Sequence, residues 1–99
     1  MNITVTSEAP DVRIAVSGRV DTNSAPELTA FVDGLSGELA GLAIDCSDLE
    51  YLSSAGLRAL LIAHKRVARS GGRLVLEYVS PAVTDVLALT GFSGIFDVR

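Results

Sequence analysis

The hydrophobic pattern of this chain switches repeatedly between a period of two residues and a period of about 3.6 residues. Apolar residues alternate with polar ones over residues 2–6 and again over residues 12–16. The stretch between them, "SEAPD", is rich in turn-forming residues. Two alternating runs joined by a short polar turn predict an antiparallel β-hairpin. From residue 25 onward apolar residues return at helical spacing, so the chain must combine strands with helices.

Three helices are predicted after the hairpin. The first is expected from about Ala25 to Leu35, with a capping box formed by Ser24 and Glu27 at its start and Gly37 near its end. The second begins near Ser54 and stops at "SGG", residues 70–72. The third has Ser80 as its N-cap, Pro81 in its first turn and Gly91 as its stop signal.

Short apolar segments between and after these helices predict three further strands, at residues 42–46, 73–79 and 95–98. The resulting order, β-β-α-β-α-β-α-β, predicts one α/β domain over residues 1–99. Its sheet is expected to be mixed but mostly parallel, with the N-terminal hairpin supplying an antiparallel edge. Functional residues of such sheets gather beyond the carboxyl ends of strands, which here means the loops at residues 18–23 and 47–53.

Composition excludes several classes of function. The chain is 48% apolar and 20% charged, as expected of a globular domain, and no apolar run reaches the length of a membrane span. The N-terminus lacks the basic and apolar segments of a signal peptide, so we expect a cytoplasmic location and no membrane partner. Cys46 and His64 are the only residues of their types, so neither a disulfide nor a metal site is expected, and no cofactor is implied.

Several basic residues share a polar face of the second predicted helix, namely Arg58, Lys65, Arg66 and Arg69. The formal net charge of the whole chain is -4. We therefore interpret this face as a solvated surface and expect no direct contact with nucleic acid.

Two adjacent serines, Ser53 and Ser54, stand at the start of the second helix. A serine hydrolase is excluded, because His64 lies about 15 Å along the same helix from Ser54 and the G-x-S-x-G motif is missing. The phosphate-loop motif is also missing, although a helix N-terminus favours an anion, including a phosphoryl group carried by a serine. A simple cap would explain one serine, but it explains less well the second serine and the small residues Ala55 and Gly56.

The stretches "DCSDLEYLSSAGLRALLIAHKRV" and "SGRVDTNSAPEL", together with the element order, resemble the STAS domain. They are most similar to the bacterial anti-sigma factor antagonists, and the resemblance covers essentially the full chain. Its most specific part is a strand ending in D-x-S, here Asp45 to Ser47, followed after six residues by a serine near S-x-G-L, here Ser53 and Ser54 to Leu57.

The resemblance implies a binding protein without catalysis of its own. In that family an anti-sigma factor that is itself a serine kinase phosphorylates the antagonist, and a phosphatase resets it. The unphosphorylated antagonist captures the anti-sigma factor and frees a sigma factor. By position Ser54 is the phosphoacceptor. Ser53 is the alternative, because it stands where the family often has Asp.

Asp21 occupies the place of an acidic residue common in the loop after the second strand, and its side chain is expected to be exposed beside the serines. The residues expected to contact the partner are Asp21, Thr22, Ser53, Ser54, Ala55, Gly56 and Arg58. Family members often carry a further C-terminal helix. Any binding contribution from it is expected to be missing here or supplied otherwise.

Two alternatives remain open from the sequence. One is a STAS subunit of a transporter or signalling complex that is never phosphorylated. The other is a small enzyme or nucleotide-binding module that uses the same anion-friendly helix start. Tight stoichiometric binding of ATP or GTP would favour the latter.

Overall fold

The computed structural model describes residues 1–35, 37 and 39–99 of the chain. Three α-helices, one short 3₁₀ helix and six strands occur in this part of the chain. In chain order they are β1 (Asn2–Ser7), β2 (Asp11–Val20), α1 (Ala25–Asp33), β3 (Gly41–Asp45), β4 (Leu49–Leu52), α2 (Ser54–Ala68), β5 (Arg73–Glu77), α3 (Pro81–Leu89), η1 (Phe92–Gly94) and β6 (Asp97–Val98).

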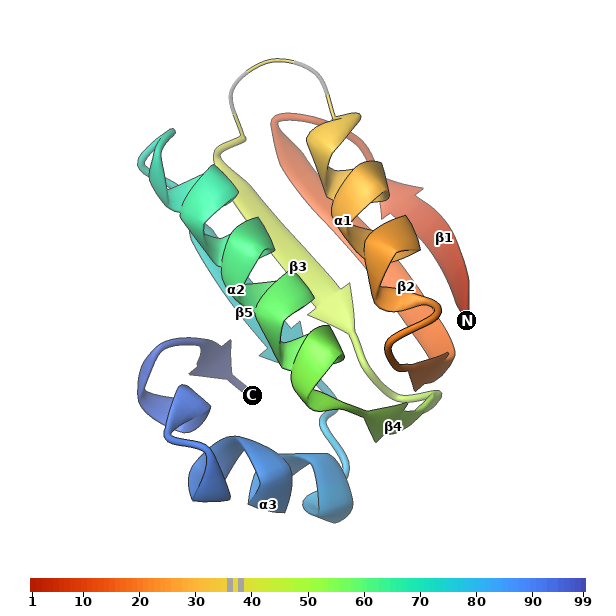
Figure 1. The fold of residues 1–99 in the computed structure, drawn as a ribbon. Helices are drawn as coiled ribbons and strands as arrows, with labels where there is room; N and C mark the ends of the chain where they lie inside the picture. The colour runs from red at the N-terminus through yellow and green to blue at the C-terminus, as the bar shows by residue number, and fades with distance from the viewer. Residues whose placement is uncertain (36, 38) are drawn as a thin grey trace.

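The strands form one mixed sheet in the order β1-β2-β3-β5-β6, and the short β4 pairs with the end of β2. β1 and β2 are antiparallel, whereas the other pairs are parallel. Figure 1 shows α1 and α2 side by side on one face of the sheet, with α3 below them. The predicted hairpin and the predicted mostly parallel sheet are therefore both confirmed.

The core lies between the sheet and the two helices. Alternate residues of each central strand point toward the helices, as the pleat requires, and β2 contributes Val12, Ile14 and Val16. The helices meet them with apolar stripes that include Leu28 of α1 and Leu60 of α2. None of the helices in the described ranges is long and apolar enough to cross a bilayer.

Several predicted boundaries were wrong. α1 ends at Asp33 and not at Leu35, because the backbone leaves the helix at its C-cap, Gly34. The strand predicted at residues 73–79 stops at Glu77, because Tyr78 adopts a left-handed conformation with φ of 56°. β6 is likewise limited to Asp97–Val98.

β4 was not predicted. Its four residues lie inside the segment 47–53, which we expected to be a loop. β4 pairs Tyr51 with Arg19 and Leu52 with Val20, near the carboxyl end of β2. This pairing places the chain that leads into α2 beside the loop that follows β2.

Candidate functional site

The two serines at the start of α2 have different roles in the structure. Ser53 is the N-cap: its backbone is extended, and its Oγ accepts a hydrogen bond of 3.2 Å from the Gly56 N–H. The Ser53 N–H also donates to the Val20 carbonyl at 2.9 Å, which ties the helix start to β2. Ser54 is the first helical residue and is exposed. Among the described residues its hydroxyl has no hydrogen-bond partner.

The two small residues after the serines, Ala55 and Gly56, also differ in their burial. Ala55 is half-buried at the surface. Gly56 is buried, and a Cβ there would lie 2.6 Å from Leu52 Cδ1 and 2.8 Å from the Val20 carbonyl oxygen. Gly56 was expected to contact the partner, but it is buried, and the space that a side chain would need there is filled by β2 and β4. Gly56 allows α2 to approach the sheet closely and so positions Ser54.

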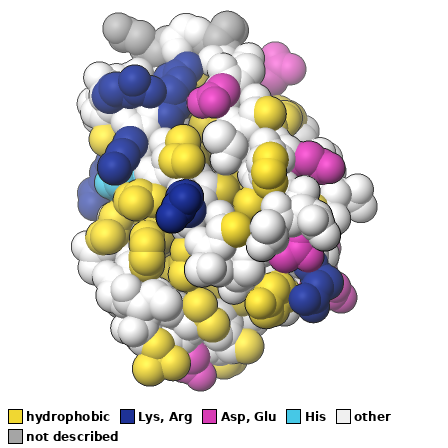
Figure 2. All heavy atoms as spheres, in the orientation of Figure 1, with side chains coloured by type: hydrophobic (Ala, Val, Ile, Leu, Met, Phe, Trp, Pro, Cys, Tyr) yellow, Lys and Arg dark blue, Asp and Glu magenta, His cyan; other side chains and the backbone are white. Residues whose placement is uncertain are grey.

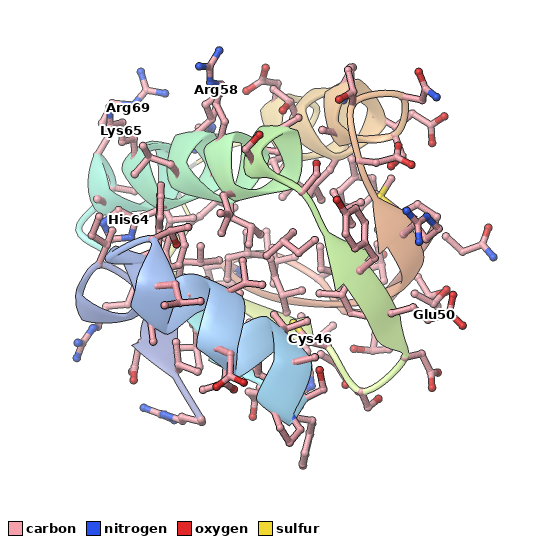
Figure 3. All side chains as sticks on the ribbon, turned by 60° about the horizontal axis from the view of Figure 1, so that its bottom comes forward. Cys46, Glu50, Arg58, His64, Lys65 and Arg69 are labelled. Atoms are coloured by element: carbon pink, nitrogen blue, oxygen red, sulfur yellow. The ribbon has the colours of Figure 1, made fainter. Side chains whose placement is uncertain are left out.

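A surface hollow of about 370 Å³ adjoins the exposed serine. It lies between the N-terminal ends of α1 and α2 and is lined by Thr22, Ala25, Pro26, Ser54, Ala55 and Arg58. Four of these six residues belong to the set expected from the sequence to contact a partner. Arg58 lies one helical turn beyond Ser54, on the same side of α2, and its side chain is exposed. In Figure 3 Arg58 points away from the body of the protein.

The Asp21 side chain is 34% exposed in the loop after β2, and its carboxylate is engaged in a turn. Its Oδ1 accepts hydrogen bonds from the N–H groups of Asn23 at 3.0 Å and Ser24 at 3.1 Å. The Ser24 N–H is the largest cause that holds the pKa of Asp21 below its usual value, and the Arg19 charge lowers it further. Asp21 therefore shapes the turn that leads into α1.

This turn also replaces the predicted capping box. The Ser24 hydroxyl donates to the Arg19 carbonyl at 2.8 Å and accepts from the Asp21 N–H at 2.9 Å. It makes no capping hydrogen bond to α1. The prediction was wrong because Ser24 bonds backward along the chain.

Two exposed residues beside this turn were missed by the sequence analysis. The Arg19 guanidinium lies over the Tyr51 ring, 4.2 Å from its centroid, and Arg19 Nε is 4.0 Å from Asp21 Oδ2. Tyr51 is 41% exposed. The alternation in "LEYL", with two buried leucines around an outward tyrosine, is the signal that could have indicated it. Arg19 and Tyr51 extend the surface that carries Asp21.

His64 lies ten residues beyond Ser54 on the same straight helix, as the sequence predicted. It is half-buried, and its ring meets that of Phe96 edge-on at 5.9 Å between centroids. Figure 3 shows it directed toward the C-terminal segment. The histidine therefore packs between elements and lies far from the exposed serine.

Comparison with known proteins places this arrangement in a family. The family model described as "Mlab, STAS domain" matches residues 3–97. The chain belongs to the STAS domain family. It is 31% identical over 98 residues to the anti-sigma-B factor antagonist of Bacillus subtilis (strain 168), covering 99% of this chain and 90% of that protein. Within the family it therefore groups with the anti-sigma factor antagonists.

Solved structures of anti-sigma factor antagonists have the same fold. An anti-sigma factor antagonist from Mycobacterium paratuberculosis superposes with a TM-score of 0.83 at 27% identity, over 99% of this chain and 86% of that one. The anti-sigma factor antagonist SpoIIAA in its unphosphorylated form gives a TM-score of 0.84 at 18% identity, over 99% and 88% of the two chains. The phosphorylated form of SpoIIAA, a Bacillus cell fate determinant, gives a TM-score of 0.72 at 16% identity, over 99% of this chain and 91% of that one.

The D-x-S motif of this STAS domain organises the loop between β3 and β4. Asp45 Oδ1 accepts the Ser47 N–H at 2.9 Å, and this hydrogen bond is the main reason that the pKa of Asp45 lies below its usual value. Cys46 points inward, as Figure 3 shows, and its N–H donates to the Glu77 carbonyl at 2.8 Å. Burial raises the pKa of its thiol to about 12, so Cys46 is a protonated core residue at neutral pH. The motif therefore fixes the loop between β3 and β4, and β4 leads directly into the serines.

Proposed function

We propose that this STAS domain captures an anti-sigma factor while Ser54 is unphosphorylated, and that it thereby frees a sigma factor. One observation carries the proposal: Ser54 is exposed beside a hollow, whereas the neighbouring Ser53 already acts as the helix cap. The name of the Bacillus subtilis relative supports the role of antagonist. The protein would act by binding alone, without catalysis or a cofactor.

Ser54 is proposed as the phosphoacceptor in preference to Ser53. A kinase must bring the serine oxygen to the γ-phosphorus of ATP, which requires an accessible hydroxyl. Ser54 is exposed. The Ser53 hydroxyl is half-buried and accepts the Gly56 N–H, so its modification would disturb the cap.

The surface proposed to meet the partner surrounds the hollow. It consists of Thr22, Ser54, Ala55 and Arg58, with Asp21 and Ser53 at its edge. Arg19 and Tyr51 continue it along β2 and β4 as an exposed aromatic and cationic pair, and such residues are enriched at interfaces. Gly56 would support this surface from beneath.

Phosphorylation would switch binding and leave the fold intact. A phosphoserine adds about -1.5 to -2 charges at neutral pH. The first turn of α2 contains no acidic residue, so the positive end of the helix dipole is free to accept this charge. Within a closed interface the same group adds bulk and must lose its water, which disfavours the complex. SpoIIAA, whose structure is known in both phosphorylated and unphosphorylated forms, supports the compatibility of this fold with a phosphate.

The proposed partners are an anti-sigma factor that is also the serine kinase and a phosphatase that resets the phosphoserine. Neither nucleic acid nor a membrane would be contacted directly. We propose a cytoplasmic location for this role.

The test is phosphorylation in vitro with the cognate anti-sigma factor kinase. Incubation with ATP should add one phosphoryl group, which mass spectrometry should locate on Ser54. Ser54→Ala should abolish the modification, and Ser53→Ala, as the matched control, should retain it. A phosphate found on Ser53 alone would refute the choice of acceptor. An anti-sigma factor that neither binds nor phosphorylates the protein would refute the function.

A further inference from the structure

The exposed side of α2 carries basic residues but no acidic ones. Arg58, Lys65 and Arg69, which we call the basic stripe, are spaced at i, i+7 and i+11 and are all exposed. Such spacing places them along one side of the helix over about 16 Å. Ile62 lies between them at i+4 and is 38% exposed. Ser54, four residues before Arg58, stands at the start of the same line.

Charges are separated across the helical face of the molecule. Figure 2 shows most dark-blue side chains over α2, and magenta ones toward α1 and the edge of the sheet beside it. The acidic residues of α1, Glu27 and Asp33, are exposed. Since the chain as a whole has a formal net charge of -4, a basic helix face does not follow from its composition.

The basic stripe forms no ion pair with any residue that the structure describes. The salt bridges in that part of the chain involve Arg13, Arg19 and Arg99. Arg66, whose sequence spacing predicts the same polar face of the helix, donates to the carbonyls of Leu35 at 2.8 Å and Gly37 at 3.2 Å. Arg66 therefore binds the backbone at Leu35 and Gly37. By contrast, Figure 3 shows Arg58, Lys65 and Arg69 directed away from the protein.

The helix dipole explains only part of this arrangement. It favours cations near the C-terminal end, where Lys65 and Arg69 lie. It does not favour Arg58, which lies in the second turn. Like charges at i and i+4, such as Lys65 and Arg69, repel one another within a helix. An external anionic surface would offset the unfavourable position of Arg58 near the positive end of the dipole. It would also offset the repulsion between Lys65 and Arg69.

We propose that the basic stripe binds an acidic segment of the anti-sigma factor, whose carboxylates and one apolar side chain match Arg58, Ile62, Lys65 and Arg69. This inference rests on the proposed function. The basic charges favour an acidic partner. The exposed apolar side chain of Ile62 favours a protein segment, because a partner bound by charge alone would not use it. Phosphorylation would then weaken the complex in a second way. A phosphate on Ser54 lies one turn from Arg58, and its charge repels an acidic partner bound along the basic stripe.

The first experiment compares charge reversals in binding to the anti-sigma factor. Lys65→Glu and Arg69→Glu should each weaken binding by about tenfold or more and reduce its salt dependence, because like charges then face one another. Arg73→Glu is the matched control: Arg73 is exposed, and it alternates with Leu74 so that it points to the opposite face of the sheet. The affinity of the Arg73→Glu variant for the anti-sigma factor should stay close to that of the unchanged protein. Equal losses for Arg69→Glu and Arg73→Glu would overturn the proposal.

A second experiment decides the case in which the anti-sigma factor does not bind at all. That result would refute the proposed function but would leave the stripe to be tested with a synthetic acidic amphipathic helix. Titrated into ¹⁵N-labelled protein, this peptide should shift the amide signals of residues 58–69, and Arg69→Glu should abolish the shifts. Shifts elsewhere would overturn the proposal. So would binding of duplex DNA or phosphatidylglycerol vesicles at these residues without any response to the peptide.

Discussion

At the scale of single residues, the pair Ser53–Ser54 combines two tasks that one serine could not perform together. A capping hydroxyl is committed to a backbone N–H, whereas a phosphoacceptor must be accessible. Ser53 accepts the Gly56 N–H, and Ser54 is exposed in the first turn. A chain with both residues can be modified at one without losing the cap provided by the other.

Substitution of each serine by alanine should separate these tasks. Ser53→Ala should lower the free energy of unfolding by about 1 kcal/mol, because a cap is lost. Ser54→Ala should change it by less than about 0.5 kcal/mol, as expected of an exposed residue without a hydrogen bond. Chemical denaturation of the two variants measures both values, and each variant serves as the control for the other. Equal losses would contradict the division of roles.

Asp21 predicts a specific dependence of stability on pH. Its folded-state pKa lies below the ordinary 3.8, so its carboxylate favours folding above pH 3.8 and this contribution disappears as the pH falls through the folded-state pKa. Asp21→Asn cannot gain or lose a proton in this range. The stability difference between the original protein and Asp21→Asn should therefore shrink as the pH falls below 3.8. A difference that remains constant on acidification would show that the carboxylate charge is irrelevant to the turn.

At the scale of elements, the position of α2 depends on its contact with the end of β2 and with β4. The sequence predicted the start of α2 because an apolar helical pattern follows the serines. It did not predict β4, because four residues are too few for a recognisable period and their partner, the extension of β2 to Val20, is distant in sequence. Gly56 was misinterpreted for the same reason, since its neighbours Val20 and Leu52 are brought to it only by this pairing.

The position of α2 can be tested by Gly56→Ala. Helix propensity alone favours alanine, by up to about 1 kcal/mol. The contacts at 2.6 Å with Leu52 Cδ1 and 2.8 Å with the Val20 carbonyl oxygen predict the opposite sign. We expect a net loss of about 1–3 kcal/mol in the free energy of unfolding, as for other overpacked sites.

Gly94→Ala is the control for this substitution, because a Cβ at residue 94 would meet nothing within 4 Å. Thermal or chemical denaturation should find this variant close to the original protein. A stabilised Gly56→Ala would show that α2 does not depend on this close approach.

At the scale of the whole molecule, the fold brings the N-terminal ends of α1 and α2 together at one surface. The sequence predicted the α/β class, the hairpin and the helix that carries the serines, because these follow from local periodicity. Family resemblance supplied the residues expected to contact a partner, of which Thr22, Ser54, Ala55 and Arg58 line the hollow. The sequence could not indicate that Asp21 is engaged in a turn, that Arg19 stacks on Tyr51, or that Arg66 leaves the basic face of α2. Each of these depends on contacts between segments distant in space or on a choice among local hydrogen bonds.

The central claim is that phosphorylation of Ser54 changes binding and leaves folding unaltered. Paired calorimetry on phosphorylated and unmodified protein tests it, with one melting scan and one titration with the anti-sigma factor for each. Stability should stay equal or rise by about 0.3–1 kcal/mol, since the phosphate meets the positive end of the α2 dipole. Affinity should fall by about a hundredfold or more, because a desolvated charge costs several kcal/mol. A stability loss of several kcal/mol, or no change in either quantity, would contradict the claim.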